Sequence, residues 1–233
     1  MQQEIKTITL NMGLKLGTVN CYLVKSDNGY FLIDTGPSNK RFDLEKELEN
    51  AGCRPGNLKL IIITHGDFDH TGNAAHLHEK FGAKIAMHYD DLGMAEHGDM
   101  FWNRKSNFII KRIAPVLFRF GKSERFNPDL YIEDGDSFSE YGFDAEVIHI
   151  PGHSRGSVGI LTTEGDLFCG DLLINTDKPS INSIMDDKAA ANVSIEKLES
   201  LELKTIYPGH GKSFSMNHLL KTIKKGKYER NNR

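Results

Sequence analysis

The feature that most constrains this chain is an apolar segment that runs directly into a polar turn. Residues 58–63, L-K-L-I-I-I, form the most apolar run in the sequence, which is typical of a strand that a parallel sheet buries on both faces. The turn that follows, T-H-G-D-F-D-H-T-G at residues 64–72, contains two histidines and two aspartates. These groups can bind a divalent metal, so they predict a polar site where the buried strand ends.

Strand and helix signals alternate around this turn. Asp-Asn-Gly at residues 27–29 joins two β-branched or aromatic segments and predicts a hairpin. Residues 38–50 change to a helical period, with Ser38 as the expected N-cap and Gly52 as the stop signal. A second helix is expected after the polar turn, and the second half of the chain repeats strand-like segments. This order predicts an α/β protein in which helices cover stacked sheets.

The domain organisation follows from the same patterns. No low-complexity linker interrupts the sequence, so residues 1–233 are interpreted as one domain. Further helices are expected at about 194–201 and from about 216. The apolar pattern loosens at about 91–128, which predicts a helical insertion, and basic side chains dominate residues 101–126. Those basic groups either face water on an ordinary surface or form a lid or docking surface for an anionic substrate or membrane.

Composition limits the partners. The chain has 29 basic and 32 acidic side chains and a formal charge of −3, which argues against a nucleic-acid partner. No apolar run approaches the roughly 20 residues of a membrane helix, and the start of the chain lacks a signal-peptide pattern. The cysteines are too few and too scattered for a disulfide framework, and they fit a reducing compartment: Cys21, Cys53 and Cys169. We therefore expect a cytoplasmic protein with a small-molecule substrate, and a homodimer stays open.

Three polar residues later in the chain also follow strand-like segments. His153 lies in P-G-H-S, Asp171 in C-G-D, and His210 in P-G-H-G. Glycine before a histidine lets the backbone approach closely, as a buried metal site requires. Each residue alone is a weak signal, because a single histidine after a strand more often has a structural role. The two P-G-H turns together strengthen the case for a shared site.

The whole set of motifs resembles the metallo-β-lactamase superfamily. The order H-x-D-x-D-H, P-G-H-S, G-D and P-G-H-G is similar to the family's H-x-H-x-D-H followed by three single ligands. Residues 18–36 resemble its opening strands, which end in L-I-D-T-G. The resemblance covers nearly the whole chain. It implies an αββα four-layer sandwich, the metallo-β-lactamase fold, with two metal ions at one edge of the paired sheets.

The resemblance also assigns roles to individual residues. The implied metal ligands are His65, Asp67 and His153 at one ion, Asp69, His70 and His210 at the other, and Asp171 as a bridge between them. Asp34 of L-I-D-T-G resembles the family's carboxylate that supports the metal-binding histidines, with an ordinary turn aspartate as the alternative. Arg155 is a candidate to bind a substrate carboxylate or phosphate, with a surface ion pair as the alternative.

Position 67 departs from the family pattern, which usually has histidine there. Two divalent ions bring four positive charges, of which Asp67, Asp69 and Asp171 would cancel three. The lower residual charge should weaken the pull of the ions on bound water. A carboxylate is also a harder ligand than imidazole, so iron or manganese competes with the zinc that the family implies. The change further leaves open a first site that is weak or empty, and histidine at position 67 is expected to raise zinc retention.

The resemblance is to the glyoxalase II and lactonase branches more than to true β-lactamases. It implies a metal-dependent hydrolase that uses a metal-bridging hydroxide on an ester-like bond: a thioester, lactone or phosphoester. Asp69 is expected to orient the attacking water or transfer its proton, in addition to binding metal. The carboxylate at position 67 supports one alternative, a diiron redox enzyme that receives electrons from a separate donor protein. A non-catalytic metal-binding module is the other alternative.

Overall fold

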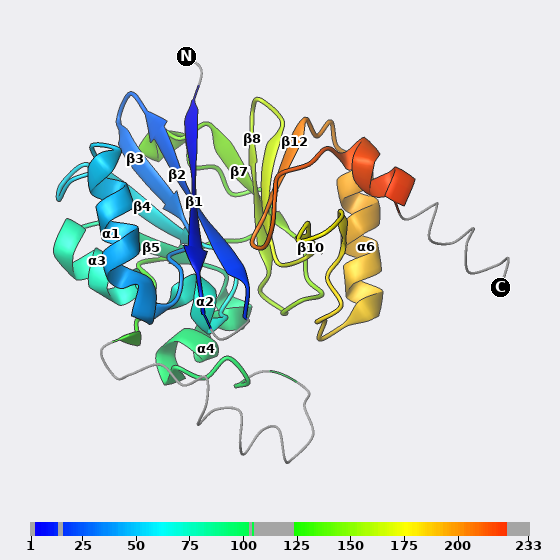
Figure 1. The fold of residues 1–233 in the computed structure, drawn as a ribbon, viewed down its shortest axis with the longest axis horizontal. Coiled ribbons are helices and arrows are strands. Elements are labelled where there is room, and N and C mark those ends of the chain that lie inside the picture. Colours follow the sequence, from blue (N-terminus) through cyan, green and yellow to red (C-terminus); the bar gives the residue numbers. More distant parts are fainter. Residues whose placement is uncertain (1–2, 14–15, 103, 105–123, 223–233) are drawn as a thin grey trace, which may run out of the picture.

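The larger of two facing sheets holds the first half of the chain (Figure 1). The computed structural model describes residues 3–13, 16–102, 104 and 124–222. In spatial order the larger sheet contains β1 (Glu4–Asn11), β2 (Thr18–Ser26), β3 (Gly29–Ile33), β4 (Leu58–Ile63), β5 (Lys84–Met87) and β6 (Leu130–Tyr131). Strands β1 to β3 pair antiparallel, and β3 to β6 pair parallel. Most of the insertion predicted at about 91–128 lies outside the described residues.

The smaller sheet is built from the second half of the chain. In spatial order it contains β12 (Thr205–Pro208), β9 (Asp166–Gly170), β8 (Val158–Thr162) and β7 (Ala145–His149). Only β12 and β9 are parallel to each other. A separate short ladder joins β10 (Leu173–Ile174) to β11 (Ser180–Ile181).

Alternation along the strands explains how the two sheets pack. In β3, Phe31 and Ile33 belong to the apolar cluster that also contains Val147 and Phe168 of the smaller sheet. Leu32 lies between them in sequence and packs in a different cluster, on the outer side of the larger sheet. Successive side chains of a strand point to opposite faces, so a strand with no polar residue can fill two apolar layers. This is the reason that β3 and β4 are buried on both faces, which the sequence predicts for β4.

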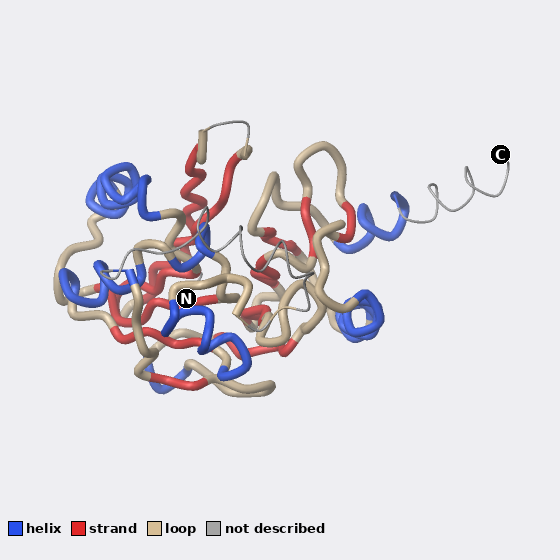
Figure 2. The backbone as a smooth tube through the Cα atoms, turned by 90° about the horizontal axis from the view of Figure 1, so that it is seen from below, coloured by secondary structure: helices blue, strands red, loops and turns tan. Residues whose placement is uncertain are grey.

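Helices cover the outer faces of both sheets. The helical elements are η1 (Ser38–Lys40), α1 (Arg41–Asn50), α2 (Phe68–Thr71), α3 (Ala74–Phe81), η2 (Tyr89–Asp91), α4 (Leu92–His97), η4 (Ser139–Tyr141) and α6 (Lys188–Glu199), followed by helical turns over residues 216–222. Leu44 of α1 and Leu77 of α3 pack on the larger sheet, and Ile195 and Leu198 of α6 pack on the smaller one. Figure 2 shows the strands between helices on opposite sides. The architecture is therefore the expected αββα sandwich.

Two local predictions need correction. Ser38 is the first residue of η1, and the helix that follows begins at Arg41 without a side-chain cap. Helix α6 begins at Lys188, earlier than the expected start at about 194. The Asp187 carboxylate caps it by accepting hydrogen bonds from the backbone N–H groups of Ala189 and Ala190. The predicted hairpin at residues 27–29 is present, because β2 and β3 pair up to Ser26 and Gly29.

One finding bears on membranes. Among the residues that the structure describes, no helix is both long and apolar enough to span a bilayer.

Candidate metal centre

The seven predicted ligands meet at the lower edge of the sandwich, near α2 and α4 in Figure 1. They follow the ends of β4, β7, β9 and β12, so both sheets contribute. Their ligand-type atoms form three groups, each within 4.8 Å: His65, Asp67 and His153; His65, His70 and Asp171; Asp69, His70 and His210. The first and third groups have the composition expected for two metal sites, and the second lies between them.

Asp171 has the position expected of a bridge. Its Oδ2 lies 3.2 Å from His210 Nε2 and 4.0 Å from His153 Nε2. Its Oδ1 lies 3.4 Å from His70 Nε2. One carboxylate therefore reaches histidines of both groups, which is the geometry that a bridging ligand needs.

Three of the four histidines are oriented by an oxygen that accepts from Nδ1. The acceptors are Asp34 Oδ2 for His70 (2.8 Å), the Ile184 carbonyl for His153 (2.8 Å) and the Thr18 carbonyl for His210 (2.6 Å). A carbonyl or carboxylate oxygen cannot donate, so the ring proton must be on Nδ1. In each ring Nε2 faces the shared site, and in the neutral ring Nε2 carries the lone pair that a metal ligand requires.

His65 is oriented by a relay from the same carboxylate. Asp34 Oδ1 accepts from the Thr64 backbone N–H, and Oδ2 accepts from Thr64 Oγ1, both at 2.8 Å. The only hydroxyl proton of Thr64 is used there, so Thr64 Oγ1 accepts from His65 Nδ1 at 3.0 Å. Asp34 thus contacts His70 directly and His65 through Thr64. Its φ of 60° is left-handed, a strained conformation for a residue with a side chain.

The fit to metal follows from these lone pairs. The Nε2 atoms face carboxylate oxygens, so acceptors oppose acceptors in a buried space. Among the described residues, four atoms of this cluster are buried without a hydrogen-bond partner: His65 Nε2, His70 Nε2, Asp67 Oδ1 and Asp171 Oδ1. Asp67 Oδ1 has an ion-pair contact instead, with Arg104 Nη1 at 2.8 Å. Buried polar atoms are rarely left without a partner, and a cation among the other three would satisfy them. The donor set of imidazole nitrogen and carboxylate oxygen fits divalent zinc, iron or manganese.

The pKa values show the same excess of acceptors. Burial alone would raise the pKa of Asp171, but His210 and His70 outweigh it and hold that pKa well below its usual range. Burial would lower the pKa of His210, yet Asp171 and then Asp69 raise it to about 9. Burial raises the pKa of Asp69, and burial together with His70 lowers that of His65. His210 and Asp69 therefore bind protons more strongly than usual, whereas Asp171 and His65 bind them less strongly, and metal binding would displace the proton of His210.

The two P-G-H turns need glycine for different reasons. A side chain at Gly209 would collide with Asp171 Oδ1 and His70 Cε1. At Gly152, φ is 148° and a side chain would collide with the Ala191 backbone of α6. The backbone therefore approaches its neighbours closely at both turns, as expected. At Gly209 the neighbours are side chains of the centre, and at Gly152 the neighbour is helix α6.

Sequence reasoning missed a buried carboxylate that joins two ligand loops. Asp91 is 1% exposed and accepts from the Gly66 N–H at 3.0 Å and from Ser154 Oγ at 2.6 Å. It also accepts from the Gly156 N–H at 2.8 Å. The loops that carry His65 and His153 are thereby held together. No motif marks Asp91, because its partners are distant in sequence.

A second missed residue is Arg104, within the predicted insertion. It is 6% exposed, and its Nη1 lies 2.8 Å from Asp67 Oδ1. The sequence shows it only as one of several basic residues between 101 and 126. Nothing in its spacing connects it to Asp67.

Arg155 lies outside this cluster of described side chains. It is exposed and lines a surface hollow with Glu96, His97 and Trp102. None of the seven predicted ligands lines that hollow. Its suggested role in binding substrate stays a prediction.

Two histidines outside the predicted ligand set also lie together. His88 and His149 stack with centroids 4.4 Å apart, and together with Asp90 they place three ligand-type atoms within 4.8 Å. The Arg155 carbonyl already accepts from His149 Nε2 at 2.9 Å. This group lies apart from the seven ligands and is partly exposed.

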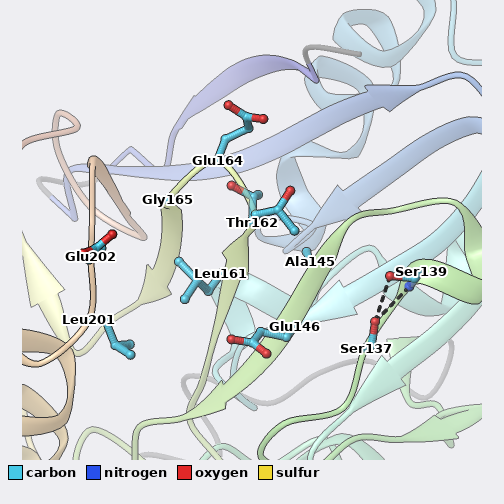
Figure 3. A pocket seen from close by; sticks show the side chains of 11 residues that line it. Ser137, Ser139, Ala145, Glu146, Leu161, Thr162, Glu164, Gly165, Leu201 and Glu202 are labelled. Carbon is cyan, nitrogen blue, oxygen red and sulfur yellow. Dashed lines mark hydrogen bonds between the residues drawn. The ribbon is translucent and has the colours of Figure 1, made fainter.

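Another hollow lies at the opposite end of β8 (Figure 3). It is lined by Glu146, Thr162, Glu164 and Glu202, among others. Val158 at the start of β8 donates to the Thr64 carbonyl beside the metal centre, whereas Thr162 is the last residue of that strand. The hollow is therefore remote from the centre, and none of the ligands lines it.

Comparison with known proteins decides the family. The sequence matches the metallo-beta-lactamase superfamily over residues 14–210. The chain belongs to this superfamily. The match includes all seven predicted ligands, and the relatives are named hydrolases, so the chain is a metallohydrolase of this family.

Relatives and solved structures agree with this assignment. The chain is 30% identical to the hydroxyacylglutathione hydrolase GloC of Haemophilus influenzae over 161 residues, which is 66% of each protein. It is 26% identical to the human acyl-coenzyme A thioesterase MBLAC2 over 221 residues, 87% of this chain and 76% of that one. A crystal structure of TTHA1623 in a di-iron-bound form superposes with a TM-score of 0.71 at 26% identity, covering 92% of this chain and 97% of that one.

Proposed function

We propose that this metallohydrolase cleaves an ester-like bond of a small molecule, with a thioester ahead of a lactone or phosphoester. The observation that carries the proposal is the convergence of four histidine Nε2 lone pairs and three carboxylates in one buried site. The names of two relatives, a thioesterase and a hydroxyacylglutathione hydrolase, support the choice of bond. A cytoplasmic location stays part of the proposal, supported by three cysteines that are free and buried.

The proposal keeps the division of ligands that the family resemblance implies. His65, Asp67 and His153 would hold one divalent ion; Asp69, His70 and His210 would hold the other; Asp171 would contact both. When bound, such a pair of ions lowers the pKa of water and polarises a carbonyl or phosphoryl oxygen. The chain's own contribution is to fix the four imidazole rings through Asp34 and the backbone carbonyls.

Asp69 is the side chain proposed to handle the proton. Its Oδ2 lies 3.5 Å from His210 Nε2, at the outer side of the second group. Asp69 is 8% exposed, whereas His65, His70 and His153 are each at 2% or less. A carboxylate at the exposed side of the centre can accept a hydrogen bond from an attacking water and carry its proton to the leaving group.

The proposal is tested by metal content and substrate class together. Purified protein should contain about two divalent ions per chain and should hydrolyse acyl thioesters faster than lactones or phosphoesters. Asp171→Ala should lower metal content at both sites and abolish hydrolysis. Lys212→Ala, an exposed change outside the seven ligands, serves as the control. Two bound ions without hydrolysis of any of the three bond classes would refute the proposal.

A diiron redox enzyme is the second candidate, supported by the carboxylate at position 67 and by the similarity to a protein solved in a di-iron-bound form. This function requires iron in the native protein and turnover of oxygen or nitric oxide with an electron donor. Colourless protein that contains zinc and hydrolyses a thioester would exclude it.

A further inference from the structure

The contacts of Arg104 link the predicted insertion to the one position that departs from the family pattern. Its Nε lies 3.1 Å from Asp186 Oδ2, and its Nη1 lies 2.8 Å from Asp67 Oδ1. Its Nη2 lies 3.4 Å from His153 Nε2. The guanidinium is 6% exposed, so water does little to stabilise its charge. Every nitrogen of the group faces a residue of the site or of its wall.

The two oxygens of Asp67 face different cations. Oδ1 faces Arg104, whereas Oδ2 lies 3.0 Å from His153 Nε2 and 3.7 Å from His65 Nε2. Two ligands on a tetrahedral ion with bonds of about 2.0–2.2 Å lie about 3.3–3.6 Å apart. The two distances from Oδ2 bracket this separation, so Oδ2 could act as a ligand to a first ion together with His65 and His153. Oδ1 faces the Arg104 guanidinium instead.

We propose that Asp67 and Arg104 act as a pair that replaces the histidine of the family pattern: Asp67 Oδ2 binds the first ion, and Arg104 cancels the charge that the carboxylate adds. The inference rests on the metal centre proposed above. A neutral histidine contributes no charge at position 67, and a carboxylate with a guanidinium also sums to zero. The reduced residual charge that the sequence implies for Asp67 is therefore restored by Arg104.

Asp186 explains how the cation is held in place. It contacts Nε of Arg104, whereas Asp67 contacts Nη1, and the Asp186 side chain is 24% exposed. Water can therefore share the charge of Asp186 when Arg104 is removed. Asp67 is 7% exposed in its side chain and has no such solvation. The partner that depends on Arg104 is Asp67.

The pairing of Asp67 with Arg104 predicts that Arg104→Gln harms the wild type but repairs the Asp67→His variant. Asp67→His alone leaves the buried guanidinium beside a neutral ring and next to the first ion, with the partly exposed Asp186 as its remaining ion-pair partner. Breaking a buried pair by removing one partner is strongly destabilising, so the Tm of metal-free protein should fall by on the order of 10 °C, and metal content should fall toward one ion per chain. This reverses the expectation, drawn from the sequence alone, that histidine at position 67 raises zinc retention.

Adding Arg104→Gln to that variant should repair it. The double variant Asp67→His with Arg104→Gln should regain most of the lost Tm and bind about two zinc ions per chain. In the Asp67 background the same Arg104→Gln change should lower the Tm of metal-free protein, because Asp67 then lacks its cation. Added metal should recover much of that loss, because the ion neutralises Asp67 in place of Arg104. Arg104→Lys keeps the charge and should stay nearer the wild type than Arg104→Gln in both Tm and metal content.

The experiment measures Tm in chelator and in excess zinc, together with zinc per chain, for the wild type and these four variants. Lys197→Gln is the matched control, since it removes a cation from an ion pair with Asp134 outside the site. Lys197→Gln should change the zinc content neither of the wild type nor of the Asp67→His variant. The proposal is overturned if Arg104→Gln lowers Tm equally with and without zinc, if it harms the Asp67→His variant as it harms the wild type, or if Arg104→Lys is as impaired as Arg104→Gln.

Failure of the metal centre gives a different result. Wild-type protein that binds fewer than two ions at saturation would refute the proposed dinuclear site. The comparison of Tm values in chelator would still decide whether Asp67 and Arg104 depend on each other.

Discussion

At the scale of single residues, the centre depends on where four ring protons lie. All four histidines have an acceptor for the Nδ1 proton, and two of these acceptors trace back to one carboxylate, Asp34. The strained φ of 60° at Asp34 is maintained because its two oxygens satisfy Thr64 and His70 at once. A residue that binds no metal thus controls two rings that are proposed to do so.

Asp34→Asn tests this control. Asp34 accepts three hydrogen bonds, from the Thr64 N–H at Oδ1 and from Thr64 Oγ1 and His70 Nδ1 at Oδ2. An amide has only one acceptor oxygen, so its NH2 group would face a donor in place of one of these oxygens and at least one of the three bonds would be lost. Substitutions of this kind typically cost 10–100-fold in metal affinity, and we expect a loss in that range, measured by competition with a chelator. Asp134→Asn at the surface should leave the affinity unchanged. Equal affinities for Asp34→Asn and the wild type would show that the orientation of the rings does not depend on Asp34.

The raised pKa of His210 predicts a pH dependence of the metal-free protein. Its folded-state pKa of about 9 lies above the ordinary value of 6.5, because Asp171 and Asp69 outweigh burial and His70. The proton therefore stabilises the fold fully below pH 6.5, and this contribution is lost as the pH rises through 9. The Tm of chelator-treated protein should fall over that interval, and His210→Ala should reduce the slope. Zinc-saturated protein should show a smaller slope, because metal has displaced the proton; an equal slope in both forms would contradict this account.

At the scale of elements, strand ends and turns place the ligands. The sequence predicts the buried strand β4, the polar turn after it and the two P-G-H turns, since each has a local signal. It places the start of α6 too late, because the first turn of that helix is mostly alanine, is capped by Asp187 and lacks the apolar periodicity that marks the rest. The contacts that fix one loop against another have no local signal at all.

Gly209→Ala tests the closest of these approaches. An added methyl group would collide with Asp171 and His70, both in the proposed centre. We expect metal affinity to fall by about 10-fold or more, in line with other changes that displace ligands, while the far-ultraviolet circular dichroism stays as in the wild type. Gly56→Ala is the control, because φ there is 90° but nothing lies within 4 Å of an added methyl group. Gly56→Ala should lower the Tm without lowering metal affinity. The steric argument would be contradicted if Gly56→Ala lowered metal affinity and Gly209→Ala did not.

At the scale of the whole molecule, the centre forms where two sheets meet. Asn20 and Tyr22 of β2 bind the Pro208 carbonyl at the end of β12, at 3.0 and 2.6 Å. These contacts join residues more than 180 positions apart, so no pattern within the sequence could indicate them. The sequence supports the α/β sandwich and the gathering of the ligands, through motifs at strand ends. Asp91 and Arg104 could not be predicted, because a single charged residue acquires a role only from what folding places beside it.

Metal removal tests whether the centre and the packing of the two sheets stabilise each other. The proposed ligands follow strands of both sheets, so binding should stabilise the whole chain and not only one loop. An ion present at 100 times its Kd contributes about 2.7 kcal/mol, so two such ions contribute about 5.4 kcal/mol. A domain of this size gains roughly 2–4 °C in Tm per kcal/mol. Chelation of both ions should therefore lower the Tm by roughly 10–20 °C, measured by calorimetry, and zinc should restore it. Asp171→Ala should remove most of this difference, since the bridge between the two groups is lost. A Tm that does not change when the ions leave would mean that the two sheets hold the loops without metal, and the rigidity of the centre would then come from Asp34, Asp91 and Asn20 alone.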